Sequence, residues 1–161
     1  MQLEKGFSYQ RPLFSKALGF IRKATLTLNM NKKVALIIMF FILGIVLIFH
    51  FLILTEQIPY DKVWAGKLNS VEEMKSFETF SILFNVFMLT VLYMKYRQLE
   101  KGVKNKVIDI LIWIFAGFFA LNTIGNLFSK SMMELILGTI LTLTSAILCF
   151  VIVKKEKTKA Q

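Results

Sequence analysis

Four long apolar runs divide the chain into spans of similar length. A helix of about 20 residues, rising 1.5 Å per residue, crosses a hydrocarbon core of about 30 Å, and each run is close to that length. The pattern therefore predicts an all-α membrane protein, a bundle of four transmembrane helices. The runs cover Val34–Leu54, Phe77–Met94, Val107–Leu127 and Met132–Val153.

Two sequence motifs refine where the helices begin. Ser70-Val-Glu-Glu73 and Ser131-Met-Met-Glu134 both match the capping box, in which a Ser hydroxyl accepts from a free backbone N–H and the acid three residues later reaches back. The second helix is therefore expected to start near Val71, ahead of its apolar run. We expect the four spans at residues 34–54, 71–94, 107–127 and 132–153.

The composition agrees with a membrane protein that holds a single domain. The chain is 56% hydrophobic with 16 Phe, and its mean hydropathy is +0.62, beyond the usual values for a soluble domain. Its 161 residues leave room for one bundle, which we place at residues 34–153. Pro12 and Pro59 lie outside the apolar runs, so no proline kink is expected inside a span.

The distribution of Lys and Arg predicts the orientation of the bundle. Sixteen of the 20 Lys and Arg lie in residues 1–33, 95–106 and 154–161, and these segments alternate with the two remaining loops. The positive-inside rule places such segments in the cytoplasm, so both termini are expected inside a bacterial cytoplasmic membrane. The net charge of +10 then indicates anionic membrane lipids as partners, and no nucleic acid.

Basic segments flank the bundle at both ends. Residues 1–33 form a basic cytoplasmic N-terminal segment. Within it, residues 1–29 mix Phe and Leu with Lys and Arg, as in an amphipathic helix that lies on anionic lipid. Met30-Asn-Lys-Lys33 is also typical of a basic lead into a first span, in which case the residues before Met30 are an upstream extension. Both interpretations stay open. Residues 154–161 form a basic cytoplasmic tail.

The polar residues within the spans gather toward the outer ends of the helices. At 1.5 Å per residue they all lie within roughly 12 Å of the outer boundary. The inner half contributes only Asp109, in a first helical turn where the helix dipole favours an acid. The outer residues together suggest a shallow, outward-facing polar pocket. These ligand-binding candidates are His50, Glu78, Ser81, Asn85, Asn122, Asn126 and Glu134.

Several candidates also have a purely structural interpretation. Asn122 and Asn126 are of a type that donates hydrogen bonds between membrane helices. Glu134 would cap the fourth helix, and His50 would be a packed or interface-facing imidazole. Glu78 is the hardest to explain in this way, because a carboxylate at this depth must find a partner, reach the interface or bind a proton.

A stripe of small residues follows one face of the fourth span. We expect this stripe to let a neighbouring helix backbone approach closely; a polar conduit wall is the alternative. A single cysteine cannot form an internal disulfide, so the cysteine of the stripe is expected to pack as a small apolar residue. The stripe consists of Gly138, Thr142, Ser145 and Cys149, spaced 4, 3 and 4 residues apart.

The sequence contains no recognisable motif for catalysis or metal binding. Gly-x-Ser-x-Gly, His-Glu-x-x-His and a glycine-rich phosphate loop are all missing. One His and one Cys do not favour a zinc site. No span carries a charge at its centre, which separates the chain from proton-coupled small multidrug exporters. We therefore expect a protein that is not an enzyme and uses no metal or cofactor.

Several stretches resemble a group of small four-span bacterial membrane proteins. The resemblance covers Met30–Val153 and leaves out the first 29 residues, and the group brings no activity, ligand or catalytic residue to transfer. It implies the same four-helix architecture. The stretches that carry it are Thr55-Glu-Gln-Ile-Pro-Tyr-Asp61, Val63-Trp-Ala-Gly-Lys-Leu68, Ser70-Val-Glu-Glu73, Phe77-Glu78 and Leu121-Asn-Thr-Ile-Gly-Asn-Leu127.

These observations predict a non-enzymatic binding or accessory protein of the membrane. Its outer pocket, built around Glu78, Asn85, Asn122 and Asn126, would take a lipid headgroup or another small amphipathic ligand. The alternative is a small transporter or channel subunit that acts as a homo-oligomer, with the small-residue stripe at the contact between protomers. A scaffold for a membrane partner protein is a third possibility.

Overall fold

The computed structural model describes residues 31–60, 63–64, 68–129 and 131–154, and within these ranges the chain is helical and contains no strand. The expectations for the first 30 residues and for the tail beyond residue 154 lie outside the described residues. Four helical stretches are long and apolar enough to cross a membrane, which confirms the all-α, four-span part of the prediction. The elements are α2 (Lys32–Leu54), α3 (Val71–Lys101), α4 (Lys106–Leu127), the π-helical turn η3 (Glu134–Gly138) and α5 (Thr139–Val153).

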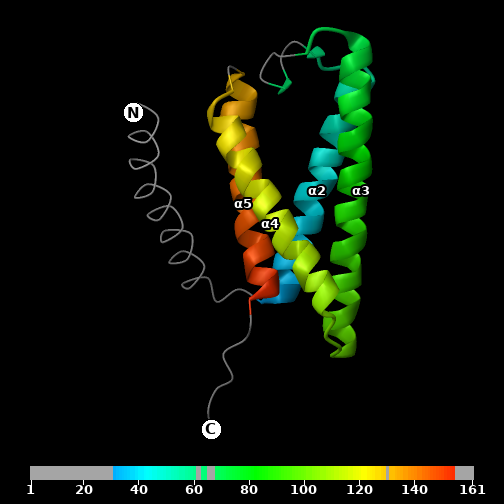
Figure 1. The fold of residues 1–161 in the computed structure, drawn as a ribbon, viewed down its shortest axis with the longest axis vertical. Coiled ribbons are helices and arrows are strands. Elements are labelled where there is room, and N and C mark those ends of the chain that lie inside the picture. The colour runs from blue at the N-terminus through cyan, green and yellow to red at the C-terminus, as the bar shows by residue number, and fades with distance from the viewer. Residues whose placement is uncertain (1–30, 61–62, 65–67, 130, 155–161) are drawn as a thin grey trace, which may run out of the picture. The chain divides into compact units, whose positions relative to one another are not determined.

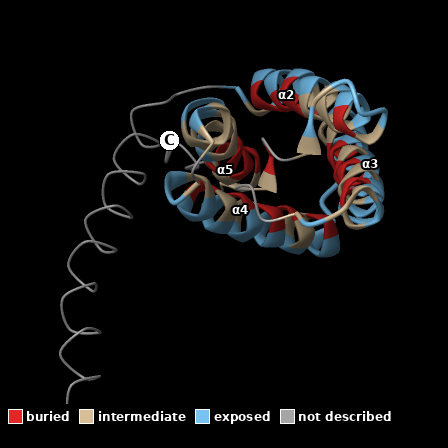
Figure 2. Cartoon of the chain, turned by 90° about the horizontal axis from the view of Figure 1, so that it is seen from above, coloured by how far each residue is buried: buried red, intermediate tan, exposed pale blue. Residues whose placement is uncertain are grey.

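The helices are arranged as two antiparallel pairs that close into a ring (Figures 1 and 2). Helix α2 packs along α3, and α4 packs along α5, while α2 also contacts α5. Helix α4 runs obliquely, from the lower part of α3 to the upper part of α5 in Figure 1. The two pairs therefore diverge toward the end where the α2–α3 loop lies. We call this the loop end, and the end with the α3–α4 turn the turn end.

Buried residues lie on the inner side of the ring and exposed residues on its outer side (Figure 2), and many of the exposed residues are large and apolar. Phe41 of α2 and Leu121 of α4, for example, are each 70% exposed. So many exposed apolar side chains would be a liability in water, whereas lipid tails solvate them. The outward faces thus agree with the length and hydropathy of the helices.

Local sequence explains where α3 begins and ends. Ser70 accepts a hydrogen bond from the Glu73 backbone N–H, and α3 starts at Val71, as the capping motif predicts. The helix continues to Lys101, seven residues past the predicted end of the span, because only Gly102 supplies the left-handed conformation (φ 67°) that stops it. Its 31 residues extend about 46 Å, so the last, polar turns of α3 lie beyond the end of the apolar run.

The second predicted capping box does not form. The Glu134 carboxylate accepts from the hydroxyl of Ser129, which lies before the predicted cap, and the Ser131 backbone N–H donates to the oxygen of that same hydroxyl. The turn that follows is π-helical, from Glu134 to Gly138. The α4–α5 connection is thus held by a side-chain contact between two loop-proximal residues, and the fourth helix starts irregularly.

The α2–α3 loop packs onto the helix ends. Its own small core consists of Ile53, Val63 and Met74, and Trp64 and Met133 pack against it. Met133 precedes η3, so this small core also reaches the α4–α5 pair at the loop end. Two loop residues, Glu56 (φ 60°) and Trp64 (φ 54°), adopt the left-handed conformation that side chains disfavour.

Candidate functional site

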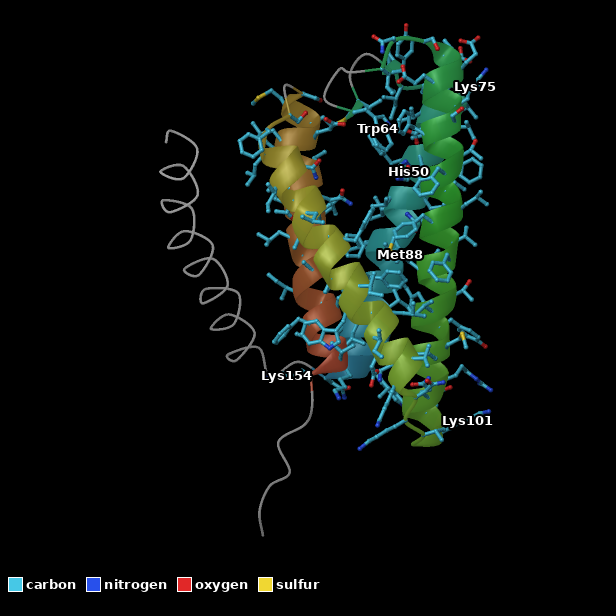
Figure 3. All side chains as sticks on the ribbon, viewed as in Figure 1. His50, Trp64, Lys75, Met88, Lys101 and Lys154 are labelled. Atoms are coloured by element: carbon cyan, nitrogen blue, oxygen red, sulfur yellow. The ribbon has the colours of Figure 1, made fainter. Side chains whose placement is uncertain are left out.

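Glu78 lies at the centre of a polar cluster at the loop end. Its side chain is completely buried, and each carboxylate oxygen has its own partner. His50 Nδ1 lies 2.6 Å from Oε2, and Trp64 Nε1 donates to Oε1 at 2.7 Å. The three side chains come from α2, the loop and α3, and Figure 3 shows Trp64 and His50 at this end of the bundle. We call these three residues the Glu78 cluster.

The cluster holds a proton between an acid and a base. A carboxylate only accepts hydrogen bonds, so either His50 Nδ1–H donates to it or a protonated carboxyl donates to the imidazole. The indole can only donate, and it therefore fixes Oε1 as an acceptor. The hydrogen bonds from His50 and Trp64 thus replace the water that the Glu78 carboxylate loses on burial. None of the described residues that contact this carboxylate is a Lys or Arg.

Sequence analysis singled out His50 and Glu78 and missed Trp64. Trp64 stands 14 residues before Glu78 in a loop, and its indole ring also packs against Phe77 with a ring-centre distance of 4.9 Å. The only signal in the sequence was the presence of an indole donor in the outer loop beside a buried acid. The sequence alone does not predict that Trp64 contacts Glu78, because this contact depends on the backbone conformation of the loop.

Farther along α3, Asn85 is buried with its carbonyl oxygen unsatisfied. The side chain is 2% exposed, and Oδ1 has no hydrogen-bond partner in the described structure. Asn85 lies seven residues, about 10 Å, beyond Glu78 and on the same helix face. Ser81 lies between them and is partly exposed. This face of α3 therefore carries a buried carboxylate and, two turns further on, a buried amide oxygen that has no hydrogen-bond partner among the described residues.

The α4–α5 pair forms a second, uncharged cluster at the loop end. Thr142 Oγ1 lies 2.9 Å from the Thr123 hydroxyl and accepts from Asn126 Nδ2 at 3.4 Å. A Cβ on Gly138 would come within 2.8 Å of Asn126 Nδ2, so this glycine permits the close approach of the two helices. We call Thr123, Asn126, Gly138 and Thr142 the hairpin cluster. Thr123 was not predicted.

The small-residue stripe lies inside the chain. Gly138 and Thr142 face Asn126 of α4, and Ser145 and Cys149 are buried. The stripe is therefore used in packing between helices of one molecule. Gly138 and Thr142 keep part of their surface exposed.

The structure does not join the predicted outer residues into one hydrogen-bonded network. Within the described ranges no hydrogen bond connects the Glu78 cluster with the hairpin cluster. Asn122 is partly exposed and makes no side-chain hydrogen bond there. Glu134 is held by Ser129 at the start of the fourth helix. The seven candidates thus share one end of the bundle but belong to two different helix pairs.

The turn end carries a polar contact that sequence analysis did not foresee. Lys95 Nζ lies 2.5 Å from Asp109 Oδ1, and the lysine side chain is only 8% exposed. Gln98, one turn further, is also buried, and its Oε1 has no partner. Asp109 does lie in the first turn of α4, and α3 continues as a helix and brings Lys95 against it as a partner that was not predicted.

The described residues contain no group of three or more His, Cys, Asp or Glu that could hold a metal ion. Cys149 is a free, buried thiol within those ranges. Comparison of the chain with protein-family models, with curated proteins and with solved structures finds no match. The resemblance to a group of four-span bacterial proteins accordingly stays a prediction.

Proposed function

We propose that this is a multi-pass protein of a bacterial cytoplasmic membrane, with both termini in the cytoplasm, that binds a lipid or small amphipathic ligand at its loop end and catalyses no reaction. The orientation is supported by the basic segments, which all adjoin the turn end or the termini, whereas the loop end is weakly acidic. In this orientation the loop end faces outward.

The observation that carries the proposal is the unsatisfied, buried acceptor of Asn85 on the face of α3 that also bears Glu78. An unsatisfied polar group at such a depth costs about 1–3 kcal/mol. A ligand that donates a hydrogen bond to Oδ1 would recover this free energy. The surrounding apolar side chains would accommodate the hydrocarbon part of the same ligand.

The placement of the uncharged polar residues supports a ligand at the loop end. Asn85 and Ser81 on α3 and the hairpin cluster on α4 and α5 all lie toward this end. Asn122 lies on α4, is partly exposed and has no hydrogen-bond partner among the described residues. We propose that its amide and the Asn85 oxygen both contact the polar part of the ligand.

No contact among the described residues favours the transporter or channel alternative over binding. It relied on the stripe of Gly138, Thr142, Ser145 and Cys149 as a contact between protomers. These residues pack within the chain. We therefore propose binding alone.

Native mass spectrometry of the protein released from membranes tests the proposal. We expect a retained lipid or amphiphile on the wild-type chain and a loss of at least about tenfold in its occupancy in Asn85→Ala and Asn122→Ala, since each removes a contact. Thr90→Ala is the matched control, because the Thr90 hydroxyl is exposed and bonds only its own helix backbone. A wild-type chain without ligand, or equal occupancy in all variants, would refute the proposal.

A further inference from the structure

Three acids of the described chain pair with a Lys or Arg, whereas Glu78 does not. Asp109 pairs with Lys95, Glu56 with Lys75 at 3.1 Å, and Glu100 with Arg97 at 3.5 Å. Glu78 is the most buried of these acids, yet its partners are an imidazole and an indole. A neutral indole N–H is a weaker donor to a carboxylate than an ammonium or guanidinium group, whose hydrogen bonds are roughly twice as strong.

We infer that Trp64 occupies the donor position at Glu78 that the primary ammonium group of an amphipathic ligand takes when it binds. This inference rests on the proposed function and names the chemical class of its ligand. The ammonium would donate to Glu78 Oε1 in place of Trp64 Nε1, while His50 stays on Oε2. No covalent step is involved.

The backbone at Trp64 supports an exchangeable contact. With φ at 54°, Trp64 adopts a conformation that a residue with a side chain disfavours. The contact with Glu78 is therefore made against a local conformational cost. A ligand that replaces the indole allows the residue to leave this conformation.

Aromatic rings beside the carboxylate suit a cation. Trp64 and Phe77 pack with a ring-centre distance of 4.9 Å, and Tyr60 belongs to the same small core of the loop. The faces of such rings attract cations within about 6 Å. The buried carboxylate thus provides the ion-pair partner, and the Phe77 ring beside the position that the indole leaves provides a cation–π surface.

The cluster is also within reach of the surface. The His50 side chain is 19% exposed although Glu78 is completely buried. Phe77 and Phe51 expose large parts of their rings on α3 and α2. An alkyl chain can lie along these rings while its ammonium group reaches Glu78.

The fluorescence of Trp64 provides a direct test. The chain has two tryptophans, so Trp113→Phe leaves Trp64 as the single indole; Trp113 lies on α4 and packs against Phe150, away from the cluster. The protein in neutral detergent is titrated with dodecylammonium, with dodecyltrimethylammonium and with a neutral dodecyl amphiphile. We expect a saturable change in Trp64 emission with dodecylammonium, at a concentration at least about tenfold lower than with the trimethyl compound, which lacks N–H donors.

Two variants separate recognition from folding. Glu78→Gln should raise the half-saturation concentration of dodecylammonium by at least about tenfold, whereas Glu72→Gln, an exposed acid on the first turn of the same helix, should leave it unchanged. Trp64→Phe keeps an aromatic ring and removes the competing N–H. It should therefore bind dodecylammonium more tightly than the wild type, measured by native mass spectrometry.

Several results would overturn the inference. One is equal binding of the primary and trimethyl compounds, and another is weaker binding by Trp64→Phe. If neutral lipid is retained but dodecylammonium binds no better to wild type than to Glu78→Gln, the ammonium inference fails while the proposed function stands. If no amphiphile of any charge is retained, the proposed function fails as well.

Discussion

The two ends of α3 each hold a buried ion-pairing group, but they bury opposite partners. At the loop end the acid Glu78 is completely buried, and its base His50 is 19% exposed. At the turn end the base Lys95 is 8% exposed, and its acid Asp109 is 37% exposed. The contacts themselves are equally short, at 2.6 and 2.5 Å. The contact distance therefore does not show which side chain of a pair needs its partner to compensate for the loss of water on burial; the exposed fractions do.

The difference predicts which substitution is costly at each end. A buried charge that loses its partner strongly destabilises the fold, whereas an exposed charge that loses its partner is solvated by water. Glu78 depends on His50 and Trp64, and Lys95 depends on Asp109. The Glu78 cluster joins α2, the loop and α3, so substitutions in it affect the packing of all three segments. The turn end joins only α3 and α4.

Removal of both donors to Glu78 should give the largest effect. We expect His50→Leu combined with Trp64→Phe to lower the free energy of unfolding in bicelles by about 3–5 kcal/mol, because a buried carboxylate then lacks its partners. Adding Glu78→Leu should restore part of this loss, since no buried charge remains. A triple variant less stable than the double variant would show that Glu78 does not depend on these donors.

Asp109→Asn should have the next largest effect. It leaves the Lys95 ammonium buried without its anionic partner, and we expect a loss of about 2 kcal/mol, because the long side chain near the helix end can partly extend toward water. Unfolding in bicelles measures this loss against wild type. A variant as stable as the wild type would mean that the turn end contributes no ion pair to folding.

Substitutions in the uncharged hairpin cluster provide a reference for the losses of stability expected at the two charged pairs. Gly138→Ala places a methyl group 2.8 Å from Asn126 Nδ2, and we expect a cost of about 1 kcal/mol, since the amide must shift. The same substitution in an Asn126→Ala background should cost less, because the space is then free. A double-mutant cycle of unfolding free energies measures this coupling. Equal costs in both backgrounds would exclude the close approach.

Lys95→Met should have the smallest effect of the four. Asp109 is exposed enough to be solvated on its own, and Met fills the apolar part of the lysine side chain. We expect a change below about 0.5 kcal/mol in the free energy of unfolding. A loss as large as that of Asp109→Asn would contradict the asymmetry between acid and base at this end.

The helices could be predicted from the sequence because hydropathy and capping are local signals. The spans at Val34–Leu54 and Val107–Leu127 lie within two residues of α2 and α4. The end of α3 could not be found in this way, because residues after the apolar run continue the helix until Gly102. The contact between Lys95 and Asp109 depends on that continuation, and it was missed for the same reason.

The site could be predicted only in part. Glu78 and His50 were identified because a carboxylate and an imidazole are unusual within apolar runs. Their contact with Trp64 depends on a loop path that includes a positive φ at a residue with a large side chain. No periodicity encodes such a path. The outer residues belong to two clusters because their hydrogen bonds form within different helix pairs, and this pairing is likewise not encoded by periodicity.

The central claim is that the loop end holds an amphipathic ligand. A crystal structure grown from a lipidic mesophase tests this claim most directly. The account predicts non-protein density between the two helix pairs at the loop end, with a donor atom within hydrogen-bond distance of Asn85 Oδ1 or Glu78. Density accounted for entirely by protein, with Asn85 Oδ1 paired to a protein donor and Glu78 to His50 and Trp64 alone, would contradict it.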